Sequence, residues 1–330
     1  MGDKQRSPAA RVVADSVSSA GERLTTLEVR LHRFVLAEFN THRAFSRNSA
    51  SSRAIPVRRE IDRVGADPAY PLEWPTEQRG MQGGAALSAS EQAAAMVVWD
   101  ETRQAVIAAA ERLEALGVHK SVTNRLLEPF MWQTIIVSAT DWDGFFTQRC
   151  SPLAQPEIRA AAEAMRAVYL ASTPRSLAAG EWHLPYVQPD ESLELGAAKR
   201  AAAARCARVS YLTHDGRRDL AADLQLYDRL VAARPPHASP LEHVARPRNN
   251  DEPAQGNFRG WIQLRHLVLP VLKHVPRQSR LIRESRAAAT RRRAFAQHSS
   301  GGDRCQGGPA LRLANRQPFS RRSPALIASK

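Results

Sequence analysis

Basic residues are concentrated at the C-terminal end of this 330-residue chain, and this distribution decides which part of it can build a core. From Arg265 to Lys330 the chain holds 15 basic and 2 acidic residues, whereas residues 1–264 hold the other 32 and 31. The basic segment has only Phe295 and Phe319 as aromatics, so it buries too little apolar surface to offset the entropy of ordering. We expect a folded body over residues 1–265 and a disordered low-complexity tail over residues 266–330.

The distribution of charge also limits the kinds of partner that we expect the protein to bind. The net charge of +14 suggests a nucleic-acid binder, but the body is electrically balanced, so we expect only nonspecific contact of RNA or DNA with the tail. The tail is equally compatible with sequence that has drifted, or been read out of frame, beyond the folded body. No run approaches the ~20 apolar residues of a membrane helix, and the N-terminus lacks an apolar signal region. We therefore expect a cytoplasmic protein with no membrane contact.

Cysteine usage agrees with a reducing compartment. The three cysteines, Cys150, Cys206 and Cys305, are widely spaced and odd in number. This spacing matches no metal-ligand pattern, and we expect no metal site.

Apolar periodicity predicts strands and helices in the body. Leu27, Val29 and Leu31 alternate with charged or polar neighbours, which is typical of a half-buried strand. Helical spacing predicts helices over 90–116, 120–130, 156–169 and 219–231, with Gly117 ending the first. We expect Met96 and Trp99 of the first helix in the core. Residues 56–90 are rich in proline and glycine and are expected to form a long irregular excursion.

A polar run, residues 41–53, carries the strongest functional signal. It follows a short apolar segment, and we expect it on a helix. Guanidinium groups grip phosphate oxygens through paired, charge-assisted hydrogen bonds, and hydroxyl and amide groups fill the remaining lone pairs. A solvated loop or helix face is an equally good interpretation of the composition alone. The candidate ligand-binding residues of the run are His42, Arg43, Ser46, Asn48, Ser51 and Arg53.

The spacing of these six residues resembles the signature of the flavin-dependent thymidylate synthases, Arg-His-Arg-x-x-Ser-x-Asn-x-x-Ser-x-Arg. All six match, and only the leading Arg differs, being Thr41 here. Six agreements at fixed spacing are far more specific than a lone glycine motif.

Two arginines farther along the chain stand in apolar surroundings, where an unpaired guanidinium is costly to bury. Arg125 and Arg149 each need an anion, and salt bridges to Glu128 and Glu157 are the structural alternatives to a ligand. The family resemblance implies that Arg125 binds the nucleotide. It also implies that Arg149 lies against the pyrimidine ring and favours loss of the N3 proton, because a nearby cation stabilises the anionic ring.

Two further motifs extend the resemblance. Residues 207–211 match the family's Ala-Arg-Val-Ser-Tyr, and residues 237–243 resemble its His-x-Ser/Thr-Pro-Phe-Glu-His with Leu241 in place of Phe. The resemblance implies that His237 and Ser239 contact the flavin. A metal site at His237 and His243 lacks carboxylate or thiolate partners at suitable positions. In the family these motifs precede the arginine-rich signature, whereas here they follow it, which suggests a circular permutation.

The resemblance implies an α/β fold, with helices packed on a mainly antiparallel sheet, and a homotetramer. It implies reductive methylation of dUMP to dTMP, with methylenetetrahydrofolate as carbon donor, NADPH as reductant and FAD as hydride carrier. Arg149 takes the catalytic role. The residues expected to bind the nucleotide are Glu38, Ser51, Ser52, Arg53 and Arg125. The residues expected to line the FAD are His42, Arg43, Ser46, Asn48, Ser49, His237 and Ser239.

Several positions depart from the family pattern, mostly on the flavin side. Glu38 stands where many relatives have Gln, and Ser49 where they have Glu. Ser138, Thr140 and Gly144 replace an Asn, an Arg and an Asn that touch the flavin. Three alternatives therefore stay open: a catalytically degenerate homologue, a methyltransferase that uses Cys150 or Cys206 as nucleophile, and a basic-tailed nucleic-acid-binding protein.

Overall fold

The computed structural model of the protein describes residues 7–178, 180–211, 218–249 and 251–269. These residues belong to one compact unit, Met1–Val271. Residues 266–269 of the predicted tail are described and complete a short helix, α9 (Leu264–Val268). The rest of the predicted tail, with Cys305, lies outside the described residues.

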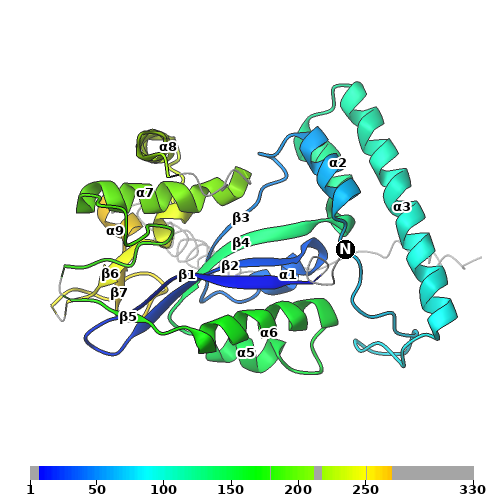
Figure 1. The fold of residues 1–330 in the computed structure, drawn as a ribbon, viewed down its shortest axis with the longest axis horizontal. Coiled ribbons are helices and arrows are strands. Elements are labelled where there is room, and N and C mark those ends of the chain that lie inside the picture. Colours follow the sequence, from blue (N-terminus) through cyan, green and yellow to red (C-terminus); the bar gives the residue numbers. More distant parts are fainter. Residues whose placement is uncertain (1–6, 179, 212–217, 250, 270–330) are drawn as a thin grey trace, which may run out of the picture. The chain divides into compact units, whose positions relative to one another are not determined.

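A five-stranded sheet is the centre of the fold (Figure 1). Its strand order is β3-β4-β2-β1-β5, and every neighbouring pair is antiparallel except β1 and β5. The strands are β1 (Ala9–Val17), β2 (Arg23–His32), β3 (Ser46–Ser49), β4 (Trp132–Ala139) and β5 (Arg175–Ser176). A separate antiparallel pair joins β6 (Ala245–Pro247) to β7 (Trp261–Gln263). The predicted fold class, helices on a mainly antiparallel sheet, is confirmed.

Alternating side chains on β2 separate the two faces of the sheet, as the sequence predicted. Leu27, Val29 and Leu31 are fully buried, whereas Glu28 and Arg30 are only half-buried. β2 pairs with β4 along its whole described register from Thr25 to His32, so it forms the rigid middle of the sheet.

Two helices cover the face that carries Leu27, Val29 and Leu31. They are α5 (Asp143–Arg149) and α6 (Pro156–Ala171), which Figure 1 shows together below the sheet. Pro156 is the first residue of α6, where its missing N–H costs nothing. Ile158 and Met165 of α6 are fully buried against Ile135 and Val137 of β4 and the aromatic rings of α5. The predicted helix over 156–169 is confirmed.

The opposite face carries a buried line of polar side chains. Thr26 Oγ1 lies 2.6 Å from Ser138 Oγ and 2.8 Å from His183 Nε2, and Ser138 Oγ lies 2.8 Å from His243 Nδ1. His183 Nδ1 completes the line at 2.9 Å from Ser16 Oγ. All five side chains are at most 4% exposed, so each must be hydrogen-bonded to be stable there.

The second helical layer covers this polar face, on the side of the sheet away from α5 and α6 (Figure 1). Its elements are α7 (Leu195–Arg208), η4 (Val209–Tyr211), α8 (Leu220–Ala232) and η5 (Ser239–Glu242). Cys206 and Val209 pack on Ile136 of β4, which brings the end of α7 onto the sheet. The helix predicted over 219–231 is confirmed as α8, and Asp219 caps it by accepting a hydrogen bond from Ala222 N–H at 3.0 Å.

A helical arm follows β3 and precedes β4. It consists of α2 (Val57–Ala66), α3 (Ala89–Ala115) and α4 (Lys120–Leu127), which continues as η3 (Glu128–Phe130). The expectation of an irregular excursion over 56–90 is wrong for its first part, because α2 buries Val57, Ile61 and Val64 at helical spacing. The remainder, up to Ser88, contains no helix or strand, only an isolated bridge between Pro75 and Ala86.

Helix α3 is the longest described element, and its position was predictable. A capping box begins it, with Glu91 N–H donating to Ser88 Oγ and Ser88 N–H donating to Glu91 Oε2. Gly117, at φ +74°, follows its end. The expectation that Met96 lies in the core is wrong, since it is 41% exposed, while Trp99 is half-buried against the core of the arm.

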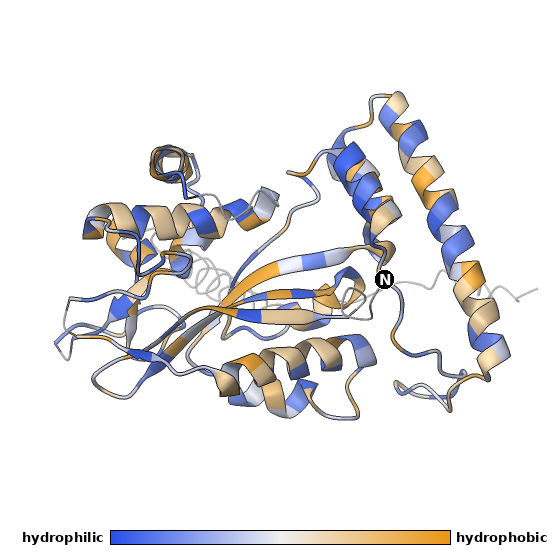
Figure 2. Cartoon of the chain, viewed as in Figure 1, coloured by the Kyte–Doolittle hydropathy of each residue, from blue (hydrophilic) through white to orange (hydrophobic). Residues whose placement is uncertain are grey.

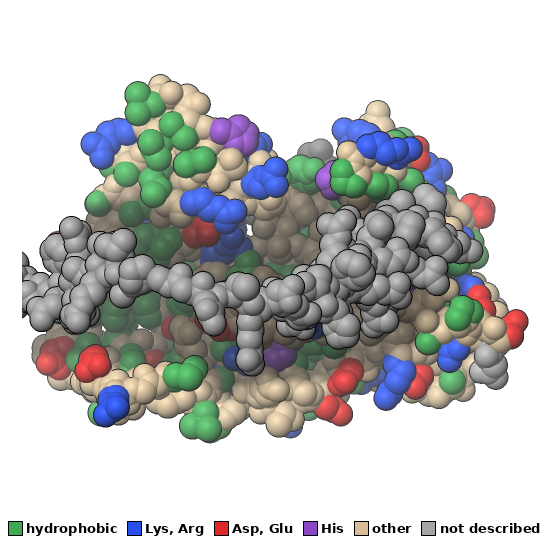
Figure 3. Space-filling model, turned by 180° about the vertical axis from the view of Figure 1, so that it is seen from behind, with side chains coloured by type: hydrophobic (Ala, Val, Ile, Leu, Met, Phe, Trp, Pro, Cys, Tyr) green, Lys and Arg blue, Asp and Glu red, His purple; other side chains and the backbone are tan. Residues whose placement is uncertain are grey.

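The surface of the arm is unusually apolar. Figure 2 shows apolar and polar residues mixed around α3, and Figure 3 shows apolar side chains gathered over the arm. Val97, Val98, Val122 and Leu126 of α3 and α4 are between 39% and 61% exposed. Such a patch marks a surface that can bind another protein.

No helix in the described part of the chain is long and apolar enough to cross a membrane.

Candidate active site

Part of the polar signature is a strand, and none of it is the predicted helix. After the short helices η2 (Arg33–Val35) and α1 (Leu36–Asn40), residues 46–49 form β3 and pair with β4. Ser46 and Asn48 are buried, whereas Arg47 and Ser49 are half-buried. This two-residue period is that of a strand, and it turns Ser46 and Asn48 toward the same side.

Asn48 is the point at which three separate motifs meet. Its side-chain N–H donates to the carbonyl of Cys206 at 2.7 Å, and its Oδ1 accepts from Ser210 Oγ at 3.4 Å and Ser239 Oγ at 3.2 Å. A backbone hydrogen bond from Ser51 N–H to the carbonyl of Ser210, 3.1 Å, adds a second link. The motifs that follow the signature in the sequence therefore join it within one folded unit.

Ser46 is hydrogen-bonded to residues in a region for which the sequence predicted no functional role. Gln263 and Asn257 donate side-chain N–H groups to Ser46 Oγ at 3.1 and 3.2 Å. Gln263 is fully buried and also donates to the carbonyl of Glu242. The run Gly256–Trp261, which follows the last family-like motif, was the only sign of this support.

His42 and Arg149 form the second group of signature contacts. Arg149 Nε–H donates to His42 Nε2 at 2.9 Å, and its Nη2 donates to Thr41 Oγ1 at 3.2 Å and to the carbonyl of Glu38 at 3.4 Å. Burial and the nearby guanidiniums of Arg149 and Arg47 lower the pKa of His42. His42 is therefore a neutral imidazole that accepts from Arg149 at neutral pH.

Arg149 has no carboxylate partner among the described residues. The alternative salt bridge to Glu157 is not formed, because Glu157 is buried and accepts from Leu72 N–H at 2.9 Å instead. All three acceptors of Arg149 are neutral, so its charge stays available to an anionic ligand.

Arg125, in contrast, has the carboxylate partner that was its structural alternative. Glu128 accepts from Arg125 Nη1 and from Arg33 Nη2, each at 2.7 Å, and from Ser52 Oγ at 3.0 Å. Arg125 is 53% exposed, so its pairing with Glu128 is weak and exchangeable. A cavity of about 520 Å³ beside it reaches Arg33 and Asn40.

The remaining predicted residues lie at or near the surface. Arg43, Arg53 and His237 are exposed, and Ser49 and Ser51 are half-buried. The side chains of Arg43 and Arg53 form no ion pair with any described residue. Of Arg53, Arg125 and Arg149, only Arg125 lines the cavity of about 520 Å³. Their convergence, which we expect between subunits, stays a prediction.

Two of the departures from the family pattern have structural roles of their own. Ser138 is fully buried and bonded to Thr26 and His243, so its hydroxyl belongs to the polar line under α7. Thr140 Oγ1 accepts from Arg259 N–H at 3.0 Å. Gly144 lies in the first turn of α5. These positions support the fold around the site.

The cysteines fit a nucleophilic role poorly. Cys206 is fully buried, and burial raises the pKa of its thiol. Burial also raises the pKa of half-buried Cys150, although Arg166 opposes this effect. Because the thiolate is the nucleophile, neither thiol is activated for attack at neutral pH.

Comparison with known proteins identifies the family. The model of the family described as thymidylate synthase complementing protein matches residues 10–175. The chain belongs to this family, the flavin-dependent thymidylate synthases. The match ends before α7, so the two motifs on η4 and η5 lie outside it.

Solved structures and curated proteins add little to this assignment. One similar structure is that of the UMP/dUMP methylase PolB from Streptomyces cacaoi bound with 5-Br UMP, which is 17% identical in sequence with a TM-score of 0.42. The match covers 50% of this chain and 90% of that chain. Its complex with 5-Br dUMP is 15% identical, with a TM-score of 0.40, and covers 50% and 91%. No curated protein matches the chain. At these scores the two structures support no conclusion about function.

Proposed function

We propose that the protein methylates dUMP to dTMP reductively, taking the carbon from methylenetetrahydrofolate with FAD and NADPH. Family membership supports the reaction class. The observation that carries the proposal is Arg149, a guanidinium with only neutral acceptors, beside a neutral His42 in the signature. A cation with no internal anion is suited to hold the anionic form of a pyrimidine ring.

The nucleotide phosphate needs further donors, and the signature loop supplies them. Ser51 and Arg53 follow β3 directly, and Arg53 makes no ion pair with a described residue. Ser52 and Arg125 are both bonded to Glu128 and would release that carboxylate to engage phosphate. Glu38 has a buried Oε2 without a partner among the described residues, as expected of a group that a ligand satisfies.

The donor set around Asn48 suits a flavin. Ser46, Asn48, Ser239 and His237 offer neutral donors and acceptors for a polar heterocycle, while His42, Arg43 and Ser49 border it in sequence. FAD, once reduced by NADPH, would supply the hydride that converts the transferred carbon to a methyl group. These side chains would orient it, and the buried contacts of Asn48 would keep the η4 and η5 segments in place.

The proposed assembly is a homotetramer in the cytoplasm, with Arg125 and Arg149 acting on a nucleotide that Ser51 and Arg53 of another subunit bind. Two observations support this arrangement. Arg125 lies beside the exposed apolar residues Val122 and Leu126 on α4, and the cavity of about 520 Å³ that it lines includes neither Arg53 nor Arg149. A subunit contact over α4 would bury the apolar patch and bring Arg125 to a second site.

Product analysis tests the proposed reaction. The purified protein is incubated with dUMP, methylenetetrahydrofolate, NADPH and FAD, and dTMP is measured by chromatography. We expect dTMP only when all four are present. Turnover without FAD or NADPH would instead favour a cysteine-dependent methyltransferase, and loss of that turnover on combining Cys150→Ser with Cys206→Ser would establish it. Binding of FAD and dUMP without turnover would identify a degenerate homologue.

A further inference from the structure

A cavity of about 380 Å³ adjoins the point where the three motifs meet, and neither the family match nor the proposed site includes all of it. It lies between the end of α7, η4, α8 and the loop before η5. The cavity is lined by Arg208, Tyr211, Leu226, Arg229, Leu230 and His237.

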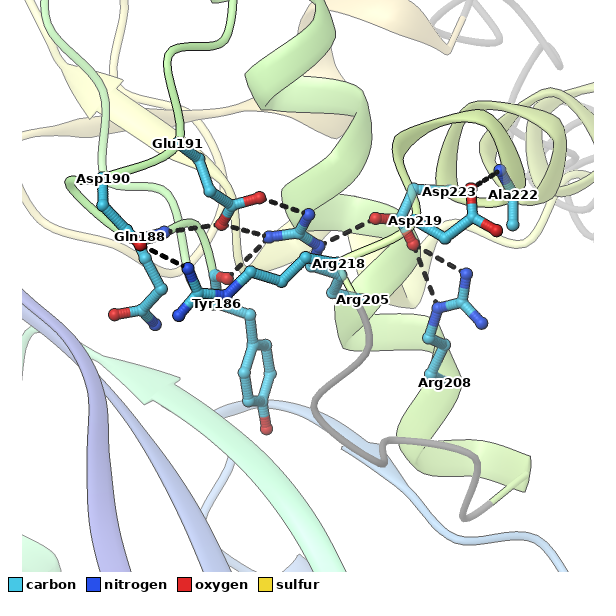
Figure 4. A network of polar contacts seen from close by, with 10 residues as sticks. All are labelled: Tyr186, Gln188, Asp190, Glu191, Arg205, Arg208, Arg218, Asp219, Ala222 and Asp223. Carbon is cyan, nitrogen blue, oxygen red and sulfur yellow. Dashed lines mark hydrogen bonds and ion pairs between the residues drawn. The ribbon is translucent and has the colours of Figure 1, made fainter.

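The position of Arg208 is fixed by a series of buried ion pairs (Figure 4). Arg208 Nε and Nη2 donate to Asp223 Oδ1 at 3.0 and 2.7 Å. Asp223 is fully buried and also accepts from Arg205 Nε at 2.8 Å. Arg205 is held in turn by both oxygens of Glu191, at 2.7 and 2.6 Å. A guanidinium placed in this way needs little reorganisation to receive a ligand.

Arg229 takes no part in this network, in which Arg205 and Arg208 pair with the carboxylates of Asp223 and Glu191. Arg229 is exposed, and its guanidinium forms no hydrogen bond or ion pair with a described residue. Among the described residues, Arg229 therefore brings to the cavity a guanidinium without a carboxylate partner, next to His237.

The rest of the cavity lining is mainly apolar and aromatic. Leu226 and Leu230 come from successive turns of α8, and the ring of Tyr211 is 44% exposed. An arginine beside an exposed aromatic ring and aliphatic side chains suits a ligand that joins an anion to a heterocycle. Arginine binds phosphate through a planar fork, so a phosphorylated nucleotide is the class that fits.

Two residues that line the cavity, Tyr211 and His237, are close in sequence to residues that contact Asn48 of the proposed flavin site. Tyr211 follows Ser210, and His237 precedes Ser239 by two residues, and both serines bond to Asn48. His237 N–H donates to the carbonyl of Leu230 at 3.0 Å, which ties this loop to α8. A phosphate in the cavity would thus belong to a ligand that also reaches Ser239.

We infer that this cavity is a phosphate subsite, in which Arg229 supplies the main contact and Arg208 the second. The inference rests on the proposed function, because it assigns the subsite to the pyrophosphate of FAD. The phosphate of dUMP is the other source of the same chemistry, and the binding measurements below distinguish the two.

The test compares Arg229→Ala with Arg112→Ala, which removes an exposed arginine on α3 without a side-chain partner among the described residues. Dissociation constants are measured for FAD, for riboflavin, which has the same ring system without phosphate, and for dUMP. We expect Arg229→Ala to weaken FAD binding about tenfold to a hundredfold, the usual loss for a charge-assisted hydrogen bond. The dissociation constants of Arg229→Ala for riboflavin and dUMP should equal those of the wild type. Arg112→Ala should leave all three dissociation constants unchanged.

Other outcomes separate this subsite from the proposed function. Weaker dUMP binding with unchanged FAD binding would keep the phosphate subsite but give it to the substrate. If the wild type binds neither ligand, the proposed function fails, and calorimetry with inorganic pyrophosphate tests the cavity by itself. Equal binding of FAD, dUMP and pyrophosphate by wild type and Arg229→Ala would overturn the inference. Arg229→Lys, which keeps the charge but not the fork, should lose less than Arg229→Ala.

Discussion

Among single residues, Arg149 is the one on which the proposed catalytic role depends. Its three acceptors are neutral, and one of them is the imidazole of His42. We expect Arg149→Ala to lower kcat for dTMP formation about a hundredfold to a thousandfold, because a charge that stabilises the reacting ring is lost. FAD affinity should stay within twofold of the wild type, and Arg112→Ala serves as the control. A drop in FAD affinity with unchanged kcat would assign Arg149 to the cofactor.

The buried histidines His183 and His243 predict how stability responds to acid. Burial lowers the pKa of each to about 3, from 6.5 in the unfolded chain. Between those two pKa values the unfolded chain binds more protons than the folded one, so acid favours unfolding. The stability that the neutral histidines contribute is therefore complete above pH 6.5 and is lost as the pH falls below that value.

Urea unfolding at pH 7.5 and at pH 4.5 measures the effect. Each histidine should cost about 2–3 kcal/mol of unfolding free energy at the lower pH. His183→Asn should be less stable at pH 7.5 but should lose less on acidification than the wild type. An identical loss in both proteins would mean that His183 does not titrate in this way.

At the scale of secondary-structure elements, the packing of α7 on α8 depends on Asp223. It is fully buried between Arg205 and Arg208, so neutralising it leaves Arg205 without one of its two anions in the interior. We expect Asp223→Asn to lower the free energy of unfolding by about 3–5 kcal/mol. The matched control is Asp228→Asn, which breaks the ion pair of Asp228 with Arg200. Because Asp228 is 65% exposed, this change should alter the free energy of unfolding by about 0.5 kcal/mol or less. Similar losses in the two variants would contradict a structural role for the network.

Elements with one-sided apolar periodicity could be predicted from the sequence. These were β2, α4, α6 and α8. Helix α3 was also predicted, although apolar and polar residues are mixed around it. In β3 the buried positions are Ser46 and Asn48, so no apolar alternation marks the strand. In α7 the buried residues are six alanines, Arg205 and Cys206, which carry no amphipathic stripe. Helix α2 is short and lies next to a segment rich in proline and glycine, which concealed its period.

The sequence predicted candidate site residues, but it did not predict the contacts that these residues make. The spacing of the signature and the resemblance identified His42, Asn48, Arg149 and Ser239. That Asn48 would be bonded to Ser210 and Ser239, and Arg149 to His42, depends on tertiary packing that no local pattern encodes. For the same reason the support of Ser46 by Gln263 was missed.

At the scale of the whole molecule, the charge distribution predicts that the basic tail is dispensable for nucleotide binding. The compact unit ends at Val271, and every contact described for the proposed site lies before that residue. A protein shortened to residues 1–271 should bind dUMP with an affinity within threefold of the full chain. It should also lose any salt-dependent binding to single-stranded DNA, because that binding relies on phosphate neutralisation by the tail. Loss of dUMP binding on shortening would favour the alternative in which the tail carries the function.

In the proposed site, guanidiniums, imidazoles and hydroxyls from separate motifs hold a flavin next to a nucleotide. The visible absorption spectrum of the purified full-length protein, supplied with FAD, shows whether such a flavin is bound. We expect the bands of bound oxidised flavin, which bleach with NADPH and return when dUMP and methylenetetrahydrofolate are added. A protein that stays colourless with excess FAD, or whose bleached flavin ignores dUMP and folate, would contradict the account.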